Sequence, residues 1–264
     1  MSSGRSPGRV EAALRDRRDA GGKCLVAYAT GGLGEDWLNT VRAIAAAGAD
    51  AIEIGVPFSD PVMDGPTIQA ANDRALEDGA TPVGILDALR GADVGAPLAV
   101  MTYYNIVHRM GLKRFATTLV DSGVSGCILP DLPLEEAGAW LNVADEAGVE
   151  PILLAAPTAP DERLPRICER SRGFVYGVGL LGVTGVRAEL AASAVEIATR
   201  LKPLTDLPVL VGVGVGTPEQ AVDAASHGDG VVIGSAVVQR MLDGAGPEGV
   251  GELVAAFRSA LDAS

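Results

Sequence analysis

The sequence predicts a (β/α)8 fold, a closed barrel of eight parallel strands and eight outer helices in one domain over residues 1–264. Short runs rich in Val, Ile and Leu alternate with amphipathic segments along the chain, as expected for parallel strands buried on both faces. The strand–helix units number eight, and no linker rich in Pro, Gly or Ser separates them. An open, doubly wound sheet is the alternative, but the count of eight and a length near the ~250 residues of such barrels favour closure.

The expected strands are 24–30, 50–55, 97–103, 125–129, 150–156, 173–178, 207–212 and 230–234. The expected helices between and after them are 35–47, 66–78, 111–122, 134–147, 161–170, 187–202, 218–226 and 247–262. Thr217 followed by Pro218 is typical of a capped helix start, and Gly123 of a helix end. We also expect an extra helix at 9–19, a short helix at 235–242, and a flexible stretch at 1–8.

Composition excludes several classes of function. With 34 acidic against 21 basic residues the net charge is −13, which repels phosphate backbones and anionic lipid and disfavours nucleic-acid and membrane-surface roles. No apolar run approaches the ~18 residues that cross a bilayer, and the first residues are polar rather than signal-like. Three widely spaced cysteines argue against a disulfide framework or zinc site and predict a cytoplasmic protein.

Chemistry in this fold lies at the carboxyl ends of the strands, and the second strand carries the strongest candidate. Alternation sends Ile52 and Ile54 to one face and Glu53 to the other. If the isoleucines pack against helices, Glu53 points into the barrel, where burial raises its pKa toward neutrality and prepares it for proton transfer. Asp60 and Asp64 follow in a proline-rich loop at the mouth, either as further acids or as ordinary turn formers.

Glycine-rich loops after the sixth, seventh and eighth strands suggest a phosphate site. They contain Gly182 and Gly185, then Gly212, Gly214 and Gly216, then Gly234 with Ser235 at a helix start. Glycine lets backbone N–H groups approach an anion, and a helix N-terminus adds the positive end of its dipole. Glycine also ends strands for steric reasons alone, so the coincidence of these loops carries more weight than any one residue.

The reaction is constrained by what the strand ends lack. The three lysines and two histidines lie away from the strands' carboxyl ends, so neither Schiff-base catalysis nor a metal site is expected. A carbon–carbon bond cleaved here requires a substrate with its own electron acceptor, such as a protonated indole ring. Tyr28, Tyr103 and Tyr176 could line a flat apolar ligand, or could simply pack in the core.

Six segments, in this order, resemble the tryptophan synthase alpha subunit over nearly the whole chain. They are IEIGVPFSDPVMDGPTIQ (52–69), MTYYNIV (101–107), LPDLPLEE (129–136), GVTG (182–185), PVLVGVGV (208–215) and GVVIGSAVV (230–238). The resemblance implies a (β/α)8 lyase that cleaves indole-3-glycerol phosphate to indole and D-glyceraldehyde 3-phosphate. It differs from the family in the turn 31–34, which reads Gly-Gly-Leu-Gly, and at 180–181, where two leucines replace Ser-Arg.

The resemblance also implies residue roles. Glu53 would protonate indole C3 and accept the proton of the glycerol hydroxyl, while Asp64 would bind the indole N–H. The loop 177–187 would form a lid, with Thr184 meeting Asp64 on closure, and Tyr176 would lie near the substrate. The residues implied at the phosphate are Gly185, Gly214, Gly234 and Ser235.

An α2β2 complex is implied as well, in which Asp60, Asn105 and Pro133 face a beta subunit that holds pyridoxal phosphate and receives indole through a tunnel. The alpha chain itself would need no cofactor. Three alternatives remain open at this point: a free-standing lyase that releases indole, a phosphosugar isomerase or epimerase barrel, and a catalytically silent regulatory partner. A metal-dependent epimerase would need ligand histidines that this sequence lacks. A silent regulatory partner would be expected to have lost Glu53 or Asp64, and both are present.

Overall fold

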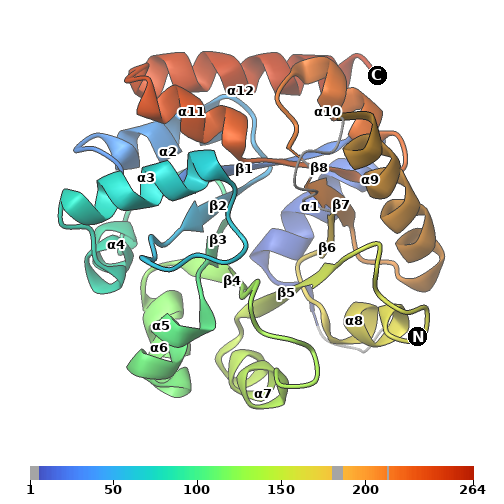
Figure 1. Cartoon of the computed structure of the whole chain (residues 1–264), viewed down its shortest axis with the longest axis horizontal. Helices are drawn as coiled ribbons and strands as arrows, with labels where there is room; N and C mark the ends of the chain where they lie inside the picture. The colour runs from blue at the N-terminus through green and yellow to red at the C-terminus, as the bar shows by residue number, and fades with distance from the viewer. Residues whose placement is uncertain (1–5, 180–186, 213) are drawn as a thin grey trace.

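Eight parallel strands follow one another in sequence order around a closed barrel (Figure 1), which confirms the predicted fold. The structure is a computed structural model that describes residues 6–179, 187–212 and 214–264, the side chains of 187–192 excepted. The strands are β1 (Cys24–Thr30), β2 (Ala51–Gly55), β3 (Leu98–Met101), β4 (Val124–Ile128), β5 (Glu150–Ala155), β6 (Val175–Val178), β7 (Val209–Gly212) and β8 (Gly230–Ile233). Hydrogen bonding between β1 and β8 closes the ring, so the open-sheet alternative is excluded.

The helices surround the barrel (Figure 1). They are α1 (Arg9–Asp19), α2 (Trp37–Ala46), α3 (Pro66–Glu77), α4 (Pro82–Leu89), α5 (Tyr104–Met110), α6 (Leu112–Asp121), α7 (Gly138–Ala147), α8 (Leu164–Arg170), α9 (Arg187–Leu201), the 3-10 turn η1 (Lys202–Leu204), α10 (Pro218–Ala225), α11 (Ser235–Leu242) and α12 (Gly246–Asp262). The two extra helices expected beside the eight-unit pattern are α1 and α11. No helix among the described residues combines the length and apolarity needed to cross a membrane.

Two helices were not predicted. The first, α4, begins at the Thr81 cap, whose hydroxyl oxygen accepts from the Gly84 amide, with Pro82 in the first turn. The second, α5, begins at Tyr104, directly after the expected strand 97–103, in a stretch to which no element was assigned before the helix expected at 111–122. The strand β3 ends at Met101, two residues earlier than expected. Gly111, with φ of 88°, separates α5 from α6.

Strand alternation builds two apolar layers. On β1, Val26 faces the barrel interior with Ala51, Ala99 and Ile128, while Leu25 packs outward with the helices. Val10 and Leu14 of α1 are fully buried in the interior layer. The extra N-terminal helix therefore closes the amino-terminal end of the barrel, which leaves the carboxyl end for chemistry.

Glu150, at the start of β5, fixes α1 in this position. Its two carboxylate oxygens accept from the backbone amides of Val10 and Glu11, each at 2.9 Å. A side chain on Gly8 would overlap with the Glu150 carboxyl, so the close approach of the helix start requires glycine there. Burial raises the pKa of Glu150 to about 7, although the two amides act in the opposite direction.

Replacing Glu150 should loosen the α1 closure. We expect Glu150→Ala to lower the free energy of unfolding by about 1–3 kcal/mol, because two buried amides lose their acceptor. Since the pKa of Glu150 is raised from 4.5 to about 7 in the folded chain, its contribution is full below the lower value and is lost as pH rises through the upper one. Urea unfolding should therefore show that Glu150→Ala lowers the free energy of unfolding more at pH ~5 than at pH ~8.

The matched control is Glu146→Ala, at an exposed position on α7, which should change the unfolding midpoint little at either pH. An Ala variant at Glu150 as stable as the parent, or one whose cost grows with pH, would contradict this account of how α1 is held.

Candidate active site

Glu53 lies inside the barrel near the carboxyl end of β2. Its neighbours Ile52 and Ile54 pack in the outer layer, as predicted, while Ala51 shares the inward face. The Glu53 side chain is 1% exposed, and its Oε2 atom has no hydrogen-bond partner among the described residues. Burial, and secondarily the nearby Asp64 carboxylate, raise the pKa of Glu53 to about 8. An unpaired acid with this pKa is equipped to donate and accept a proton near neutrality.

Asp64 is the second acid of the site and lies in the loop between β2 and α3. Its Oδ2 atom accepts from Nδ2 of Asn72 at 3.2 Å. Burial raises the pKa of Asp64 above its usual value, while hydrogen bonds with Tyr103 and Asn72 act against that shift. The two acids thus differ. No described residue donates a hydrogen bond to Oε2 of Glu53, whereas Asp64 accepts hydrogen bonds that favour its ionised form.

Tyr103 organises the loop that carries Asp64. Its hydroxyl oxygen accepts from the backbone amide of Met63 at 3.0 Å, and its ring stacks on Phe58 with the centroids 4.9 Å apart. Tyr103 caps the start of α5 rather than ending β3, so its phenol reaches across from a different unit of the barrel. Its position in the sequence predicted that Tyr103 lines a ligand, but not that it supports the loop between β2 and α3.

Tyr28 and Tyr176 are the other aromatic side chains near Glu53. Tyr28 is the register partner of Glu53 on β1, and the charge of Glu53 acts on both phenols. Burial raises the pKa of both, so they stay protonated and remain hydrogen-bond donors. A Cβ atom on Gly55 would overlap with the Tyr28 hydroxyl, and one on Gly212 would lie 2.6 Å from the Tyr176 hydroxyl. Glycine at the ends of β2 and β7 is therefore what lets the two rings occupy this position.

The glycines that follow β7 and β8 lie at the same end of the barrel as these acids. Gly214 is exposed with a positive φ of 44°, and Gly234 precedes the first residue of α11, Ser235. The first amides of α11 have no acceptors within the helix, which makes this end suitable for an anion. Thr184 and Gly185, with the rest of 180–186 and Leu180–Leu181, lie outside the described residues.

The residues predicted to face a partner are all exposed, in two loops and one helix start at the carboxyl end of the barrel. Asp60 accepts from the Ser59 hydroxyl at 2.6 Å, Asn105 lies in the first turn of α5, and Pro133 lies in the loop after β4. No motif in the sequence singled out Asp131, whose carboxylate oxygens accept from the Tyr104 amide at 2.9 and 3.1 Å and so connect the loop after β4 to the start of α5. Val62, 77% exposed, adds an apolar side chain to this rim.

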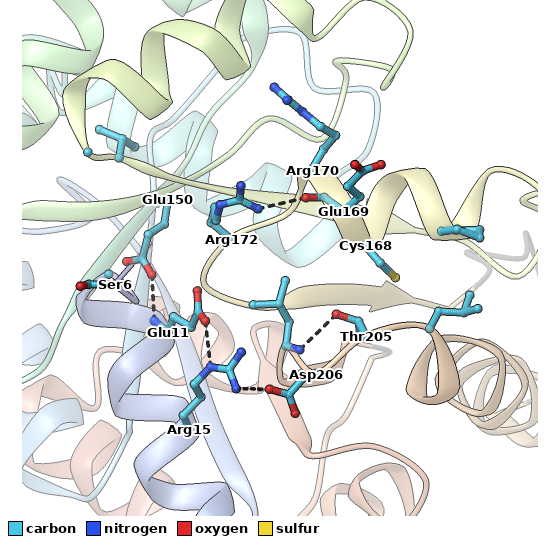
Figure 2. Close-up of a pocket in the computed structure, with 16 residues that line it drawn as sticks. Ser6, Glu11, Arg15, Glu150, Cys168, Glu169, Arg170, Arg172, Thr205 and Asp206 are labelled. Carbon is cyan, nitrogen blue, oxygen red and sulfur yellow. Dashed lines mark hydrogen bonds and ion pairs between the residues drawn. The ribbon is translucent and has the colours of Figure 1, made fainter. Parts of the chain in front are cut away.

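A cavity of about 750 Å³ lies at the other end of the barrel, between α1, α8 and residues 204–207 (Figure 2). Three of its charged groups are paired with one another, because Arg15 bridges Glu11 and Asp206 at 2.8 and 2.7 Å. Glu150 accepts from the backbone amides at the start of α1. It contains neither of the site acids, so we assign it to the seam between α1 and the barrel. No group of three or more metal-ligating side chains occurs among the described residues.

Comparison with known proteins agrees with this geometry. The family model for the tryptophan synthase alpha chain matches residues 14–258. The tryptophan synthase alpha chain of Gloeobacter violaceus is 45% identical over 273 aligned positions that cover 100% of this chain and 98% of the relative. That of Thermobifida fusca is 44% identical and covers 87% of each chain.

Solved structures give the same result. A Mycobacterium tuberculosis tryptophan synthase structure superposes with a TM-score of 0.89 at 36% identity, covering 97% of this chain and 99% of that one. A Legionella pneumophila tryptophan synthase alpha chain superposes with a TM-score of 0.87 at 31% identity, covering 97% and 98%. On sequence and structure together, this chain belongs to the tryptophan synthase alpha chain family.

Proposed function

We propose that Glu53 and Asp64 carry the lyase reaction of the family in this chain, the cleavage of indole-3-glycerol phosphate to indole and D-glyceraldehyde 3-phosphate. The observation that supports this most directly is Glu53 itself, a carboxyl group buried in the barrel with a pKa of about 8 and with one oxygen that has no partner in the described part of the chain. A structural role would leave both oxygens bonded, as they are in Glu150. The family gives the reaction class, and the residue roles are those that the resemblance implies, supported by the burial of Glu53 and the hydrogen bonds of Asp64.

The first step is proton donation from the Glu53 carboxyl to C3 of the indole. C3 becomes tetrahedral and the positive charge moves to the ring nitrogen, whose N–H donates to the Asp64 carboxylate. In the second step the ionised Glu53 takes the proton of the hydroxyl on the carbon attached to C3. The bond between that carbon and C3 then breaks, its electrons neutralise the ring nitrogen, and an aldehyde forms. Glu53 ends protonated, so the cycle needs no cofactor or metal in this chain.

The remaining residues bind and orient the substrate in this proposal. Tyr28 and Tyr176 provide the aromatic wall for the indole ring, with Tyr103 behind the Asp64 loop. The phosphate binds to the amides near Gly185, Gly214, Gly234 and Ser235, the last two at the start of α11. The lid expected over residues 177–187 closes over the substrate, with Thr184 meeting Asp64. Holding the two ends of the substrate fixes the scissile bond beside Glu53.

We further propose that the chain acts in an α2β2 complex with a tryptophan synthase beta subunit, which binds pyridoxal phosphate and uses the indole. The support is the exposed rim that carries Asp60, Asn105 and Pro133. The neighbouring Mycobacterium tuberculosis structures are of tryptophan synthase. We place the reaction in the cytoplasm because Cys24, Cys127 and Cys168 are all free thiols. A free-standing lyase remains the second candidate, since the same acids serve both.

Removal of either acid should abolish turnover. Glu53→Gln removes the proton donor and Asp64→Asn removes the negative charge, so each should lower kcat for indole release by about 10²-fold or more. Indole formation from indole-3-glycerol phosphate, followed with the purified chain, measures this. Glu146→Gln, the same change at an exposed position, should retain the parent rate. Full activity in Glu53→Gln would show that its assigned role is wrong.

The pH profile should carry the signature of the two acids. Glu53 donates first and has a pKa of about 8, so kcat/KM should fall as pH rises above that value. Asp64 must be ionised, and its pKa is raised above 3.8, so the acid limb should lie above that usual value. A pH series of kcat/KM for the parent chain tests both limbs, and activity that keeps rising well beyond pH ~8 would contradict donation by Glu53.

Addition of a beta subunit separates the two candidate functions. A subunit of the complex should show an increase in indole release of about tenfold or more when a beta subunit is added, because docking orders the loops of the rim. The control is Asn142→Asp on α7, an exposed change away from the rim. High activity alone and no response to beta subunits would favour the free-standing lyase.

A further inference from the structure

Asn72 is the one polar side chain on the buried face of α3. Along that face Ile68, Ala71 and Ala75 pack with Tyr28, so the helix lies directly beside the site. Asn72 is 2% exposed, as buried as its apolar neighbours. Its Nδ2 atom donates to Asp64, but its Oδ1 atom has no partner among the described residues. A buried acceptor without a partner is unfavourable, so stability alone does not explain an amide here.

We propose that Asn72 is a positioning residue that orients the Asp64 carboxylate toward the indole nitrogen. The proposal rests on the function proposed above and extends it to a residue that touches Asp64 rather than the substrate. Asp64 lies in a loop rather than on a strand, so the barrel by itself does not fix its side chain. The 3.2 Å bond from Asn72 connects one carboxylate oxygen to a rigid helix and, together with the hydrogen bond between Asp64 and Tyr103, orients the carboxylate that accepts from the ring N–H.

The amide also stabilises the required charge state. An ionised carboxylate only accepts hydrogen bonds, and Asn72 supplies a donor, beside the hydrogen bond with Tyr103, where burial opposes ionisation. The acid that faces Asp64 is Glu53, whose pKa the Asp64 carboxylate raises. The loop has a second tether, because Nε2 of Gln69 donates to the Asp64 backbone carbonyl at 2.7 Å. Gln69 thus holds the backbone of Asp64, and Asn72 holds its carboxylate. Variants of the two residues therefore distinguish an effect on the loop from an effect on the carboxylate.

The first test replaces the amide with an apolar side chain of similar size. Asn72→Leu should lower kcat by about tenfold or more, with KM changed by less than about threefold, because the interaction with the ring nitrogen strengthens as charge develops. The acid limb of the pH profile should move to higher pH. Asn72→Asp puts a like charge beside Asp64 and should move that limb further still. Gln69→Ala should leave the limb in place.

Two further measurements distinguish a role of Asn72 in positioning Asp64 from a folding defect and from a failure of the proposed reaction. The pKa of Asp64, followed by carbon NMR in the parent, Asn72→Leu, Asn72→Ser and Asn72→Asp chains, should rise in every variant and most in the last. This arm needs no turnover, so it holds even if the parent does not cleave the substrate, a result that would instead overturn the proposed function. In an active chain, Asp64→Asn combined with Asn72→Leu should be no slower than Asp64→Asn alone.

Two results would contradict the role of Asn72. An unchanged Asp64 pKa in Asn72→Leu and Asn72→Ser, or a limb shift in Gln69→Ala equal to that in Asn72→Leu, would show that Asn72 does not position the carboxylate. Asn142→Leu, an exposed change of the same type on α7, is the matched control and should reproduce none of these effects.

Discussion

The site depends on the burial of a single carboxyl group. Inside the barrel Glu53 is surrounded by aromatic rings and apolar side chains, and this environment disfavours its charged form. The same group on an outer helix would be ionised at neutral pH and unable to donate a proton. The closed ring of strands is what makes the burial possible, because every strand contributes side chains to an interior that excludes water.

The two ends of the barrel use buried acids in opposite ways. At the amino-terminal end, Glu150 receives two backbone amides and joins α1 to the strands, so its bonding is complete. At the carboxyl end, one oxygen of Glu53 has no hydrogen bond to any residue that the structure describes. Both groups have a raised pKa, and it is the bonding that separates a structural acid from a reactive one. The division follows the general rule for this fold, in which stability lies at one end and chemistry at the other.

Glycine positions the aromatic part of the site. The rings of Tyr28 and Tyr176 each lie over the inward position of a neighbouring strand, and only a residue without Cβ leaves space there. Gly55 and Gly212 therefore do more than end their strands. The glycines after β7 and β8 serve a different purpose, since they open backbone amides to an anion. One residue type thus contributes to the site through two separate physical properties.

Much of this protein could be predicted from the order of its residues. The alternation of apolar runs with amphipathic segments determines the eight units, and the flanking isoleucines determine the inward direction of Glu53, because strand side chains alternate with a period of two. The bond between Asn72 and Asp64, the support of Met63 by Tyr103 and the connection from Asp131 to Tyr104 could not be predicted this way. Each depends on where a helix or loop comes to lie over the barrel mouth, and tertiary packing decides that rather than any local pattern. For the same reason no helix was predicted at α5: the aromatic and β-branched residues of its first turn do not favour a helix by themselves, and tertiary packing decides the structure there.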